Sequence, residues 1–257
     1  MDKTVTDAAE AVADIGDGAS LAVGGFGLAG IPWILIDALF QRGSTGLSVA
    51  SNNCGVDGAG LGRLLDQGRI ARVIASYVGD NREFARQYLA GELEVELTPQ
   101  GTLAERMRAG GAGIGAFFTP TGAGTQVSSG GLPWRYRPDG SVAVASPAKE
   151  VRTIAGRPQV LEEAIVTDFA LVRAAVADTM GNLVFHAAAR NFNPNAAMAG
   201  RITIAEAESV VPAGELDPDS VHLPGIYVQR VVPLTPEQAA RKDIEKRTTR
   251  PRPGAAR

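Results

Sequence analysis

The sequence predicts an α/β fold with an open, mixed but largely parallel sheet that is flanked by helices. Short apolar runs alternate with amphipathic segments along most of the chain, which is the pattern of parallel strands joined by crossover helices. The 257 residues are 45% hydrophobic, which is enough to bury the core of one large domain. A turn-forming run at 178–182 separates two apolar runs and indicates a hairpin, so part of the sheet is expected to be antiparallel.

The strands are read from apolar, β-branched runs and the helices from the amphipathic segments between them. In chain order, the expected strands cover residues 19–24, 47–51, 72–78, 93–98, 116–120, 168–176, 182–186 and 201–206. The expected helices cover residues 4–15, 32–42, 59–67, 82–90, 101–109 and 193–199. Pro32 supports the start of its helix, because proline fits the first helical turn, where its missing N–H is not needed. We find no internal repeat in the sequence.

These elements form a single expected domain over residues 1–240, with a β-rich extension at about 124–158. Glycine and proline repeatedly break the periodicity of the extension, which indicates tight turns and short strands. The extension is either a flap that touches substrate or partner through Trp134, or a surface elaboration. We favour the surface elaboration.

The charge is distributed unevenly along the chain. The formal net charge is −3, yet residues 241–257 carry seven Lys or Arg and two acidic residues, a local +5, so residues 1–240 sum to −8. We expect residues 241–257 to form a basic, flexible tail. The body lacks the basic, aromatic-interleaved surface that nucleic-acid binding requires, and no apolar segment is long enough to span a membrane. Residues 1–13 do not resemble an export signal, so we expect a cytoplasmic location.

The most informative run is 17–32, where a short apolar strand leads into a glycine-dense turn and then into a helix that begins with proline. Glycines let the backbone approach a ligand closely, and the amides at a helix start carry partial positive charge. The run therefore predicts a loop that binds an anionic, phosphate-bearing ligand. The residues of this loop are Gly24, Gly25, Phe26, Gly27, Leu28, Ala29 and Gly30.

The spacing of Gly25, Gly27 and Gly30 also matches a dinucleotide-binding fingerprint, so an NAD-dependent oxidoreductase is an alternative. Two observations argue against it. Pro32 would fall inside the first turns of the fingerprint's helix, where a proline costs about 3 kcal/mol. The acidic residue that should close the second strand, about 20 residues on, is replaced by the run Asn-Asn-Cys-Gly at 52–55.

The same run resembles the signature of family I coenzyme A transferases. In that signature an Asp-Gly pair, two free positions and three apolar residues lead into Gly-Gly-Phe, three free positions, Gly, one more position and Pro. Every fixed position matches, namely Asp17, Gly18, Leu21, Ala22, Val23, Gly24, Gly25, Phe26, Gly30 and Pro32. The resemblance continues through residues 51–55, 94–102, 119–122 and 189–194, and it spans most of residues 4–232.

The resemblance implies an enzyme that moves coenzyme A between carboxylates through a glutamate, which attacks the acyl-CoA and becomes an enzyme thioester. In two-subunit members this nucleophile lies on the B subunit, and this sequence holds no matching glutamate motif, so the chain is expected to act as the A subunit, active only with that partner. Coenzyme A thioesters are then substrates, and no permanently bound cofactor is expected. The implied assembly is a heterodimer or heterotetramer. The implied acyl pair is succinyl-CoA with acetoacetate or a related 3-oxo acid, with acetate, butyrate and 3-oxoadipate as alternatives.

The resemblance also implies the site residues. Gln100 corresponds to an active-site glutamine, whose side-chain amide can stabilise the negative oxygen that develops on the attacked carbonyl. Without the resemblance, a helix cap or an ordinary turn residue is the less favoured alternative for Gln100. Asn52 and Asn53 correspond to an asparagine pair in the active-site cleft and are expected to hold substrate, although asparagine is common in turns anyway. The loop Gly24–Gly30 is expected to approach the coenzyme A thioester arm or the acyl group.

Other kinds of chemistry are weakly represented. Cys54 has no partner for an internal disulfide, and only His186 and His222 are available to activate it, so we expect a small buried residue rather than a thiol nucleophile. The cysteine, histidines and acidic residues show no metal-ligand spacing, so no metal site is expected. A non-catalytic protein that binds a sugar phosphate or an acyl-CoA on a related fold is the second alternative.

Overall fold

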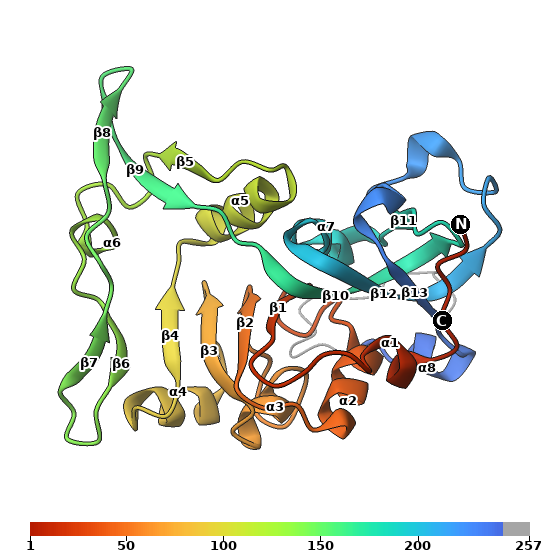
Figure 1. Ribbon diagram of the computed structural model, residues 1–257, viewed down its shortest axis with the longest axis horizontal. Coiled ribbons are helices and arrows are strands. Elements are labelled where there is room, and N and C mark those ends of the chain that lie inside the picture. The colour runs from red at the N-terminus through yellow and green to blue at the C-terminus, as the bar shows by residue number, and fades with distance from the viewer. Residues whose placement is uncertain (244–257) are drawn as a thin grey trace, which may run out of the picture.

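The computed structural model describes residues 1–243, and its centre is an eight-stranded sheet (Figure 1). Seven strands pair in parallel in the order β13-β12-β10-β1-β2-β3-β4. Their bounds are β1 Ser20–Val23, β2 Leu47–Ser51, β3 Ile70–Ala75, β4 Glu94–Leu97, β10 Thr167–Asp178, β12 Gly200–Val211 and β13 Arg230–Pro233. The eighth strand, β11 (Leu183–Val184), pairs antiparallel with the end of β10 across the expected hairpin turn. The predicted mixed, largely parallel sheet is confirmed.

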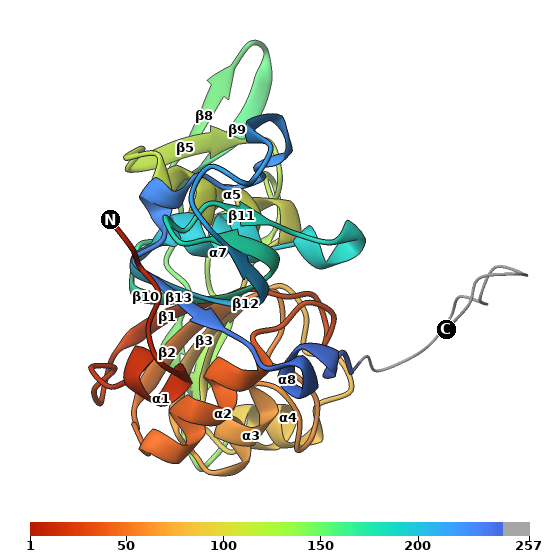
Figure 2. The ribbon, with the colours of Figure 1, turned by 90° about the vertical axis from the view of Figure 1, so that its right-hand side faces the viewer.

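Helices cover both faces of the sheet, as parallel sheets require. On one face lie α1 (Ala8–Ala11), α2 (Trp33–Arg42), α3 (Gly62–Asp66), α4 (Arg82–Leu89) and α8 (Pro236–Ala240), and on the other lie α5 (Gln100–Gly111) and α7 (Asn193–Ala199) (Figure 2). Three short 3₁₀ helices, η1 (Ala187–Arg190), η2 (Pro218–Ser220) and η3 (Gly225–Tyr227), lie in the connections.

The two faces of the sheet carry side chains of different size. Successive strand residues point to opposite faces, so Leu21 and Val23 of β1 pack toward α2, while Ala22 between them belongs to the core beneath α7. Alanines dominate that second face, and α7 contributes Ala196 and Ala197 to it. Small side chains on both surfaces let α7 approach the sheet closely. Its first residue thereby reaches the end of β1, where the predicted glycine loop begins.

Several expected elements differ from the structure in extent, such as the strand expected over 201–206, which is Gly200–Val211, and one differs in pairing. The helix expected over 4–15 is a single turn, Ala8–Ala11, because Thr4 instead pairs with Val231 at the edge of β13. The strand expected over 116–120 is present as β5 (Ala116–Thr119), but it lies outside the main sheet, in a three-stranded sheet of order β5-β9-β8. The propensity of residues 116–119 to form a strand is local, whereas their pairing partner, β9, lies about forty residues further along the chain.

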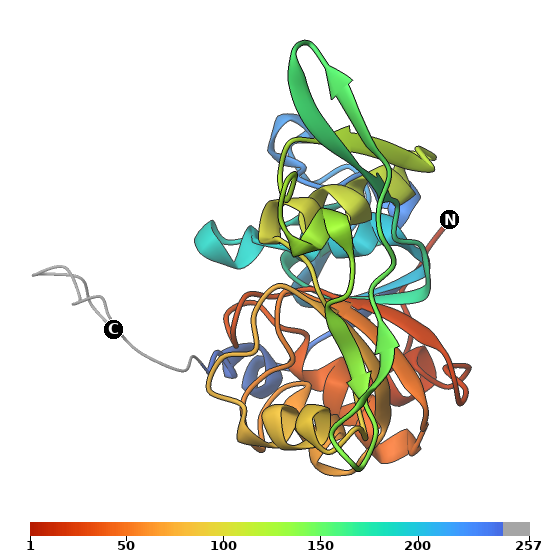
Figure 3. The same ribbon diagram turned by 90° about the vertical axis from the view of Figure 1, so that its left-hand side faces the viewer.

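The remaining short elements are α6 (Gln126–Ser129), β6 (Pro133–Tyr136), β7 (Val142–Ala145), β8 (Val151–Ile154) and β9 (Arg157–Glu163). The β6–β7 hairpin runs alongside β4 and α4 (Figure 3). Tyr88 of α4 donates a hydrogen bond of 2.6 Å to the carbonyl of Pro133, and the ring of Trp134 lies 5.7 Å from the guanidinium carbon of Arg72. Trp134 therefore lies against the middle of β3.

The basic tail expected over 241–257 lies outside the described residues from 244 onward. Arg241 is described: its guanidinium stacks 4.3 Å from the ring centroid of Trp33 and makes an ion pair of 2.5 Å with Asp37. In residues 1–243, no helix has both the length and the apolar character that a membrane span needs.

Candidate active site

The predicted site residues gather at one edge of the sheet, where β1, β2 and β4 end. Parallel strands place their carboxyl ends at the same edge, and ligands of open α/β sheets bind in the crevice outside these ends. The loop 24–30 follows β1, the pair Asn52 and Asn53 follows β2, and Gln100 comes three residues after β4. Three segments that are far apart in the sequence therefore meet there.

Gln100 and Asn52 are in direct contact. The Nε2 atom of Gln100 donates a hydrogen bond of 2.7 Å to Oδ1 of Asn52, and the Ser76 hydroxyl donates one of 3.0 Å to the same oxygen. Gln100 is the first residue of α5 and is exposed, whereas Asn52 is only 1% exposed. The buried side-chain amide of Asn52 thus fixes the orientation of the exposed Gln100 side chain.

Asn53 joins this pair to the glycine loop. Its Oδ1 atom accepts a hydrogen bond of 3.0 Å from the amide of Gly27 and a longer one, 3.4 Å, from Nδ2 of Asn52. Asn53 is 5% exposed. In the free chain both asparagines therefore hold neighbouring protein groups, and their contact with substrate stays a prediction.

The glycine loop is a tight turn closed by reciprocal backbone hydrogen bonds. The amide and carbonyl of Phe26 pair with those of Ala29, both at 3.0 Å. Gly25, Gly27 and Gly30 have φ values of 114°, 58° and 70°, a region that favours glycine, which explains their spacing without any ligand. The side chain of Phe26 is 49% exposed. Among residues 1–243, no hydrogen-bond partner is found for the amides of Gly25, Leu28 and Gly30, which leaves these three as possible donors to a ligand.

The helix that follows the loop is capped by the protein itself. The Oε2 atom of Glu206, from β12, accepts hydrogen bonds from the amides of Ile34 (2.9 Å) and Leu35 (3.0 Å). Arg173 donates to the other carboxylate oxygen at 3.1 Å. Burial raises the pKa of Glu206 to about 7, against the lowering effect of these three partners. The expectation that these helix amides meet a ligand anion is therefore wrong, because Glu206 occupies that position.

Two features were missed in the sequence, Glu206 and a second glycine loop. Residues 55–61 repeat the Gly-x-x-x-Ala-Gly-aliphatic pattern of residues 25–31, so the sequence does contain a short internal repeat. Val56 and Ala59 exchange two backbone hydrogen bonds of 3.3 and 3.0 Å, as Phe26 and Ala29 do. A Cβ on Gly60 would lie 2.9 Å from Cδ1 of Ile31, so the two loops lie against each other.

Cys54 is fully buried, and burial raises the pKa of its thiol well above the ordinary value, which keeps the thiol protonated and unreactive. His222 is engaged elsewhere, since its Nδ1 atom accepts a hydrogen bond of 2.9 Å from the amide of Phe185. The expectation of a small buried cysteine is confirmed. Within the part of the chain that the structure describes, no group of three or more metal-ligating side chains is present.

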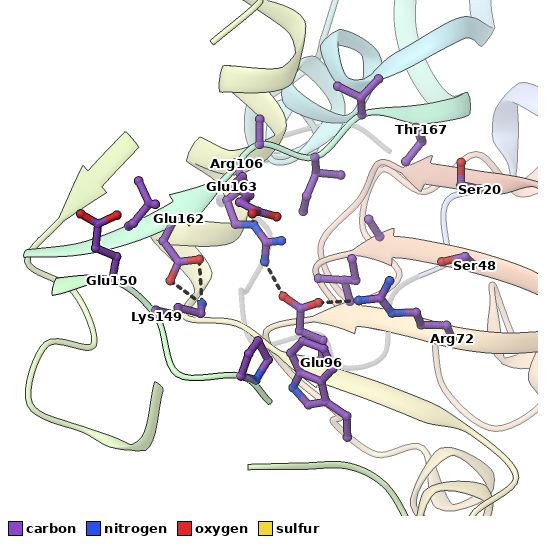
Figure 4. A pocket seen from close by; sticks show the side chains of 18 of the residues that line it. Ser20, Ser48, Arg72, Glu96, Arg106, Lys149, Glu150, Glu162, Glu163 and Thr167 are labelled. Carbon is purple, nitrogen blue, oxygen red and sulfur yellow. Dashed lines mark hydrogen bonds and ion pairs between the residues drawn. The ribbon is translucent and has the colours of Figure 1, made fainter. Parts of the chain in front are cut away.

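A cavity of about 560 Å³ lies away from this edge, between the sheet, α5 and the extension (Figure 4). Its three cationic side chains are already paired: Arg106 and Arg72 with Glu96, at 2.6 and 2.8 Å, and Lys149 with Glu162, at 2.7 Å. None of the predicted site residues lines it. Paired charges attract an anionic ligand weakly, so size alone does not make this cavity the candidate site.

Comparisons with known proteins agree with the resemblance. Residues 5–234 match the family model described as "Coenzyme A transferase". The chain is 64% identical over 250 residues, 97% of its length and 100% of the relative's, to the A subunit of the probable succinyl-CoA:3-ketoacid coenzyme A transferase of Mycobacterium tuberculosis strain H37Rv. It is 51% identical to the A subunit of the succinyl-CoA:3-ketoacid coenzyme A transferase of Helicobacter pylori strain J99, over 97% of this chain and 99% of the relative.

Solved structures share the fold at lower sequence identity. An acyl-CoA transferase from Escherichia coli O157:H7 superposes with a TM-score of 0.75 at 24% identity, covering 92% of this chain and 48% of that one. This chain thus spans about half the length of that enzyme. The glutaconate coenzyme A-transferase of Acidaminococcus fermentans gives a TM-score of 0.74 at 22% identity, covering 94% and 78%. The match of the family model and the full-length relatives show that the chain belongs to the coenzyme A transferase family.

Proposed function

We propose that this chain is the A subunit of a 3-oxoacid coenzyme A transferase, which moves coenzyme A from succinyl-CoA to acetoacetate or a related 3-oxo acid. The names of the relatives support the acyl pair. The observation that carries the proposal is the contact of 2.7 Å between Gln100 and Asn52, which joins two separately predicted site segments at the strand ends. None of the comparisons favours the dinucleotide-dependent oxidoreductase or the non-catalytic binding protein.

The reaction begins on a glutamate of the partner subunit. Its carboxylate attacks the thioester carbonyl of succinyl-CoA, and the coenzyme A thiolate leaves, which gives a mixed anhydride. The thiolate then attacks the glutamyl carbonyl of the anhydride and expels succinate, so coenzyme A becomes attached to the enzyme as a glutamyl thioester. The same two steps in reverse, with the acceptor carboxylate, release the new acyl-CoA. Every step places negative charge on a carbonyl oxygen that needs a hydrogen-bond donor.

Gln100 is the proposed catalytic residue for that charge. Its side-chain NH₂ group has two N–H donors, and the contact with Asn52 uses one of them. The second can donate to the carbonyl oxygen, and donors of this kind are worth about 3 kcal/mol or more in the transition state. Ser76 and Asn52 hold Gln100 in place before substrate arrives, so little reorganisation is needed.

Substrate binding is assigned to the loop Gly24–Gly30 and to Asn52 and Asn53. The loop offers to the thioester arm or the acyl group the amides of Gly25, Leu28 and Gly30, which have no partner within residues 1–243. Coenzyme A enters and leaves as part of the substrates, so the chain needs no permanently bound cofactor under this proposal. Acetate, butyrate and 3-oxoadipate are the other carboxylates to test.

The partner subunit must bring its glutamate to the same edge of the sheet. Two aromatic side chains are exposed there, Phe26 at 49% and Tyr77 at 60%, and they would be covered on assembly into a heterodimer or heterotetramer. We further propose a cytoplasmic location and a single domain over residues 1–240, with the extension at 124–158 as a surface elaboration and a basic tail from 241.

Acetoacetyl-CoA formation from succinyl-CoA and acetoacetate tests the proposal, with this chain on its own, the candidate B subunit on its own and the two together. Activity only in the mixture is the expected result. A stable complex that is inactive with acetoacetate but active with another acceptor would change the acyl pair. Activity of this chain on its own would overturn the assignment of the nucleophile to the partner.

A further inference from the structure

Asn193, the first residue of α7, is completely buried beside the glycine loop. Its Nδ2 atom donates hydrogen bonds to the carbonyls of Gly30 (2.9 Å), 163 positions away, and Ala189 (2.8 Å). Its Oδ1 atom accepts from the amide of Arg173 in β10 at 3.1 Å. One neutral side chain therefore ties the far end of the glycine loop to the centre of the sheet.

The near end of the loop is held by the same side chain through close packing. A Cβ on Gly24 would overlap Oδ1 of Asn193 and would lie 3.1 Å from its Cα. Only glycine fits between the end of β1 and the start of α7. Gly24 is therefore required by Asn193, in addition to any need for close approach of a ligand.

Asn191 adds a second contact to the loop from the same segment. Its Nδ2 atom donates to the carbonyl of Ala29 at 3.1 Å, and its Oδ1 atom accepts from the amide of Phe192 at 2.7 Å. Ala187, just before these residues, has φ of 45°, so this segment holds a backbone shape that alanine rarely adopts. The contacts of the two asparagines with the loop offset that strain.

We propose that Asn193 is a positioning residue for the transfer reaction, a clamp that fixes both ends of the loop Gly24–Gly30 so that its free amides face the substrate. Asn191 supports it from Ala29. The proposal rests on the function proposed above. A loop with four glycines has many accessible conformations, and donors stabilise a transition state only if they are held in place beforehand. A residue with a purely structural role would affect unfolding alone.

The Asn193→Asp variant tests the clamp with almost unchanged shape. A carboxylate there faces the carbonyls of Gly30 and Ala189 with no proton to donate, and burial raises its pKa. We expect kcat of the assembled enzyme to fall about thirtyfold at pH 8 with little change in KM for succinyl-CoA. On acidification to pH 6, the protonated carboxyl regains one donor, so the ratio of variant to wild-type kcat should rise severalfold.

Asn195→Ala is the matched control, because Asn195 lies on the same helix but donates its 3.2 Å hydrogen bond to Ala104 of α5. Its kcat should stay within twofold of the wild type, at a temperature where all variants are folded. If Asn193→Asp fails to fold, Asn191→Ala replaces it, with an expected loss of about fivefold in kcat. Wild-type kcat in Asn193→Asp, or in Asn191→Ala where that variant stands in, would overturn the proposal.

Hydrogen exchange of the loop amides in the free chain separates this inference from the proposed function. Asn193→Asp should raise exchange at residues 25–30 at least tenfold, whereas Asn195→Ala should not. If the wild-type pair transfers no coenzyme A to any acceptor, the proposed function fails, yet raised exchange still supports the clamp. Unchanged exchange would overturn the clamp whatever the activity.

Discussion

The loops 25–30 and 55–60 have the same backbone closure but are held by different chemistry. In both, two backbone hydrogen bonds close the turn, between Phe26 and Ala29 and between Val56 and Ala59. Neutral amides of Asn53, Asn191 and Asn193 hold the first loop. Carboxylates predominate around the second, since Asp57 accepts from two amides at the start of α4 and Asp66 accepts from Gly58; Asn53 adds one long hydrogen bond of 3.4 Å to the carbonyl of Gly55.

This difference shows that glycine spacing specifies a backbone shape rather than a function. The second loop supports the first, because Gly60 packs against Ile31. Its Asp57 side chain binds the start of α4 rather than a group at the strand ends. The first loop lies beside Gln100 and Asn52, whose amides can serve as donors. We therefore expect changes around the first loop to alter turnover, and changes around the second to alter stability.

The largest effect on turnover is expected for Gln100→Ala, beside the first loop. Turnover of the assembled enzyme should fall about a hundredfold or more, because one oxyanion donor is lost. Assembly and Tm should be unchanged, since Gln100 is exposed and its loss leaves the backbone intact. Steady-state kinetics and thermal unfolding of the same preparation measure both; near-normal turnover would remove the catalytic role.

A pH test addresses the cap of α2, the helix that follows the first loop. Glu206 caps α2, and its pKa is about 7 in the folded protein against an ordinary value of 4.5, so the folded state binds more protons than the unfolded state between these values. The free energy of unfolding should therefore fall as pH rises from about 4.5 to about 7, by up to about 3 kcal/mol. Denaturant unfolding of wild type and Glu206→Gln at several pH values checks this, because the variant should lack that slope. Parallel stability curves would contradict it.

The second loop is tested with Asp57→Ala. This change removes the acceptor for the amides of Arg82 and Glu83, which lie 2.8 and 3.1 Å from Oδ1, and leaves only the Asn81 side chain to cap α4. Losing a cap costs about 1 kcal/mol, or about 2–4 °C in Tm. Turnover at a temperature well below Tm should stay within twofold. A large loss of turnover with unchanged Tm would place the second loop in the site.

The smallest expected effect belongs to Ser76→Ala. The Ser76 hydroxyl is one of two donors to Oδ1 of Asn52, so its loss leaves Gln100 in contact but less firmly held. A net hydrogen bond is worth about 1 kcal/mol, which corresponds to at most about a fivefold loss of kcat. Steady-state kinetics of Ser76→Ala and Gln100→Ala side by side check that the loss of kcat is smaller for Ser76→Ala. An equal loss in the two variants would contradict this order.

Much of the fold could be predicted because its signals are local. The runs that form β1 and β2 are largely apolar, and that of β4 alternates Glu with Val and Leu. Glycine, asparagine or proline follows each within two residues, so their ends could be placed within one or two residues. Parallel pairing then brings these ends together, which is why Gln100 and Asn52, both predicted as site residues, are in contact. The roles of both residues came from the family resemblance rather than from any physical pattern.

The features that could not be predicted depend on pairing between distant segments. Glu206 is one of two acids in β12, and nothing in the sequence of that strand indicates that it lies beside β10 and faces the start of α2. Asn193 lies in the segment 189–194, which carries part of the family resemblance, but the sequence assigned it no role. Its contacts with Gly24 and Gly30 arise only when α7 packs on the sheet. A buried acid in a strand is the one signal that could have suggested Glu206.

The covering of both borders of the main sheet affects the chain before it finds its partner. The β6–β7 hairpin lies along β4, and residues 3–5 bond to Val231 on β13, so neither outer strand presents a bare row of backbone groups to another molecule (Figure 1). At the borders of the main sheet, strand-to-strand pairing between copies is thereby disfavoured. Under the proposed function, association with the partner subunit is left to the edge where β1, β2 and β4 end.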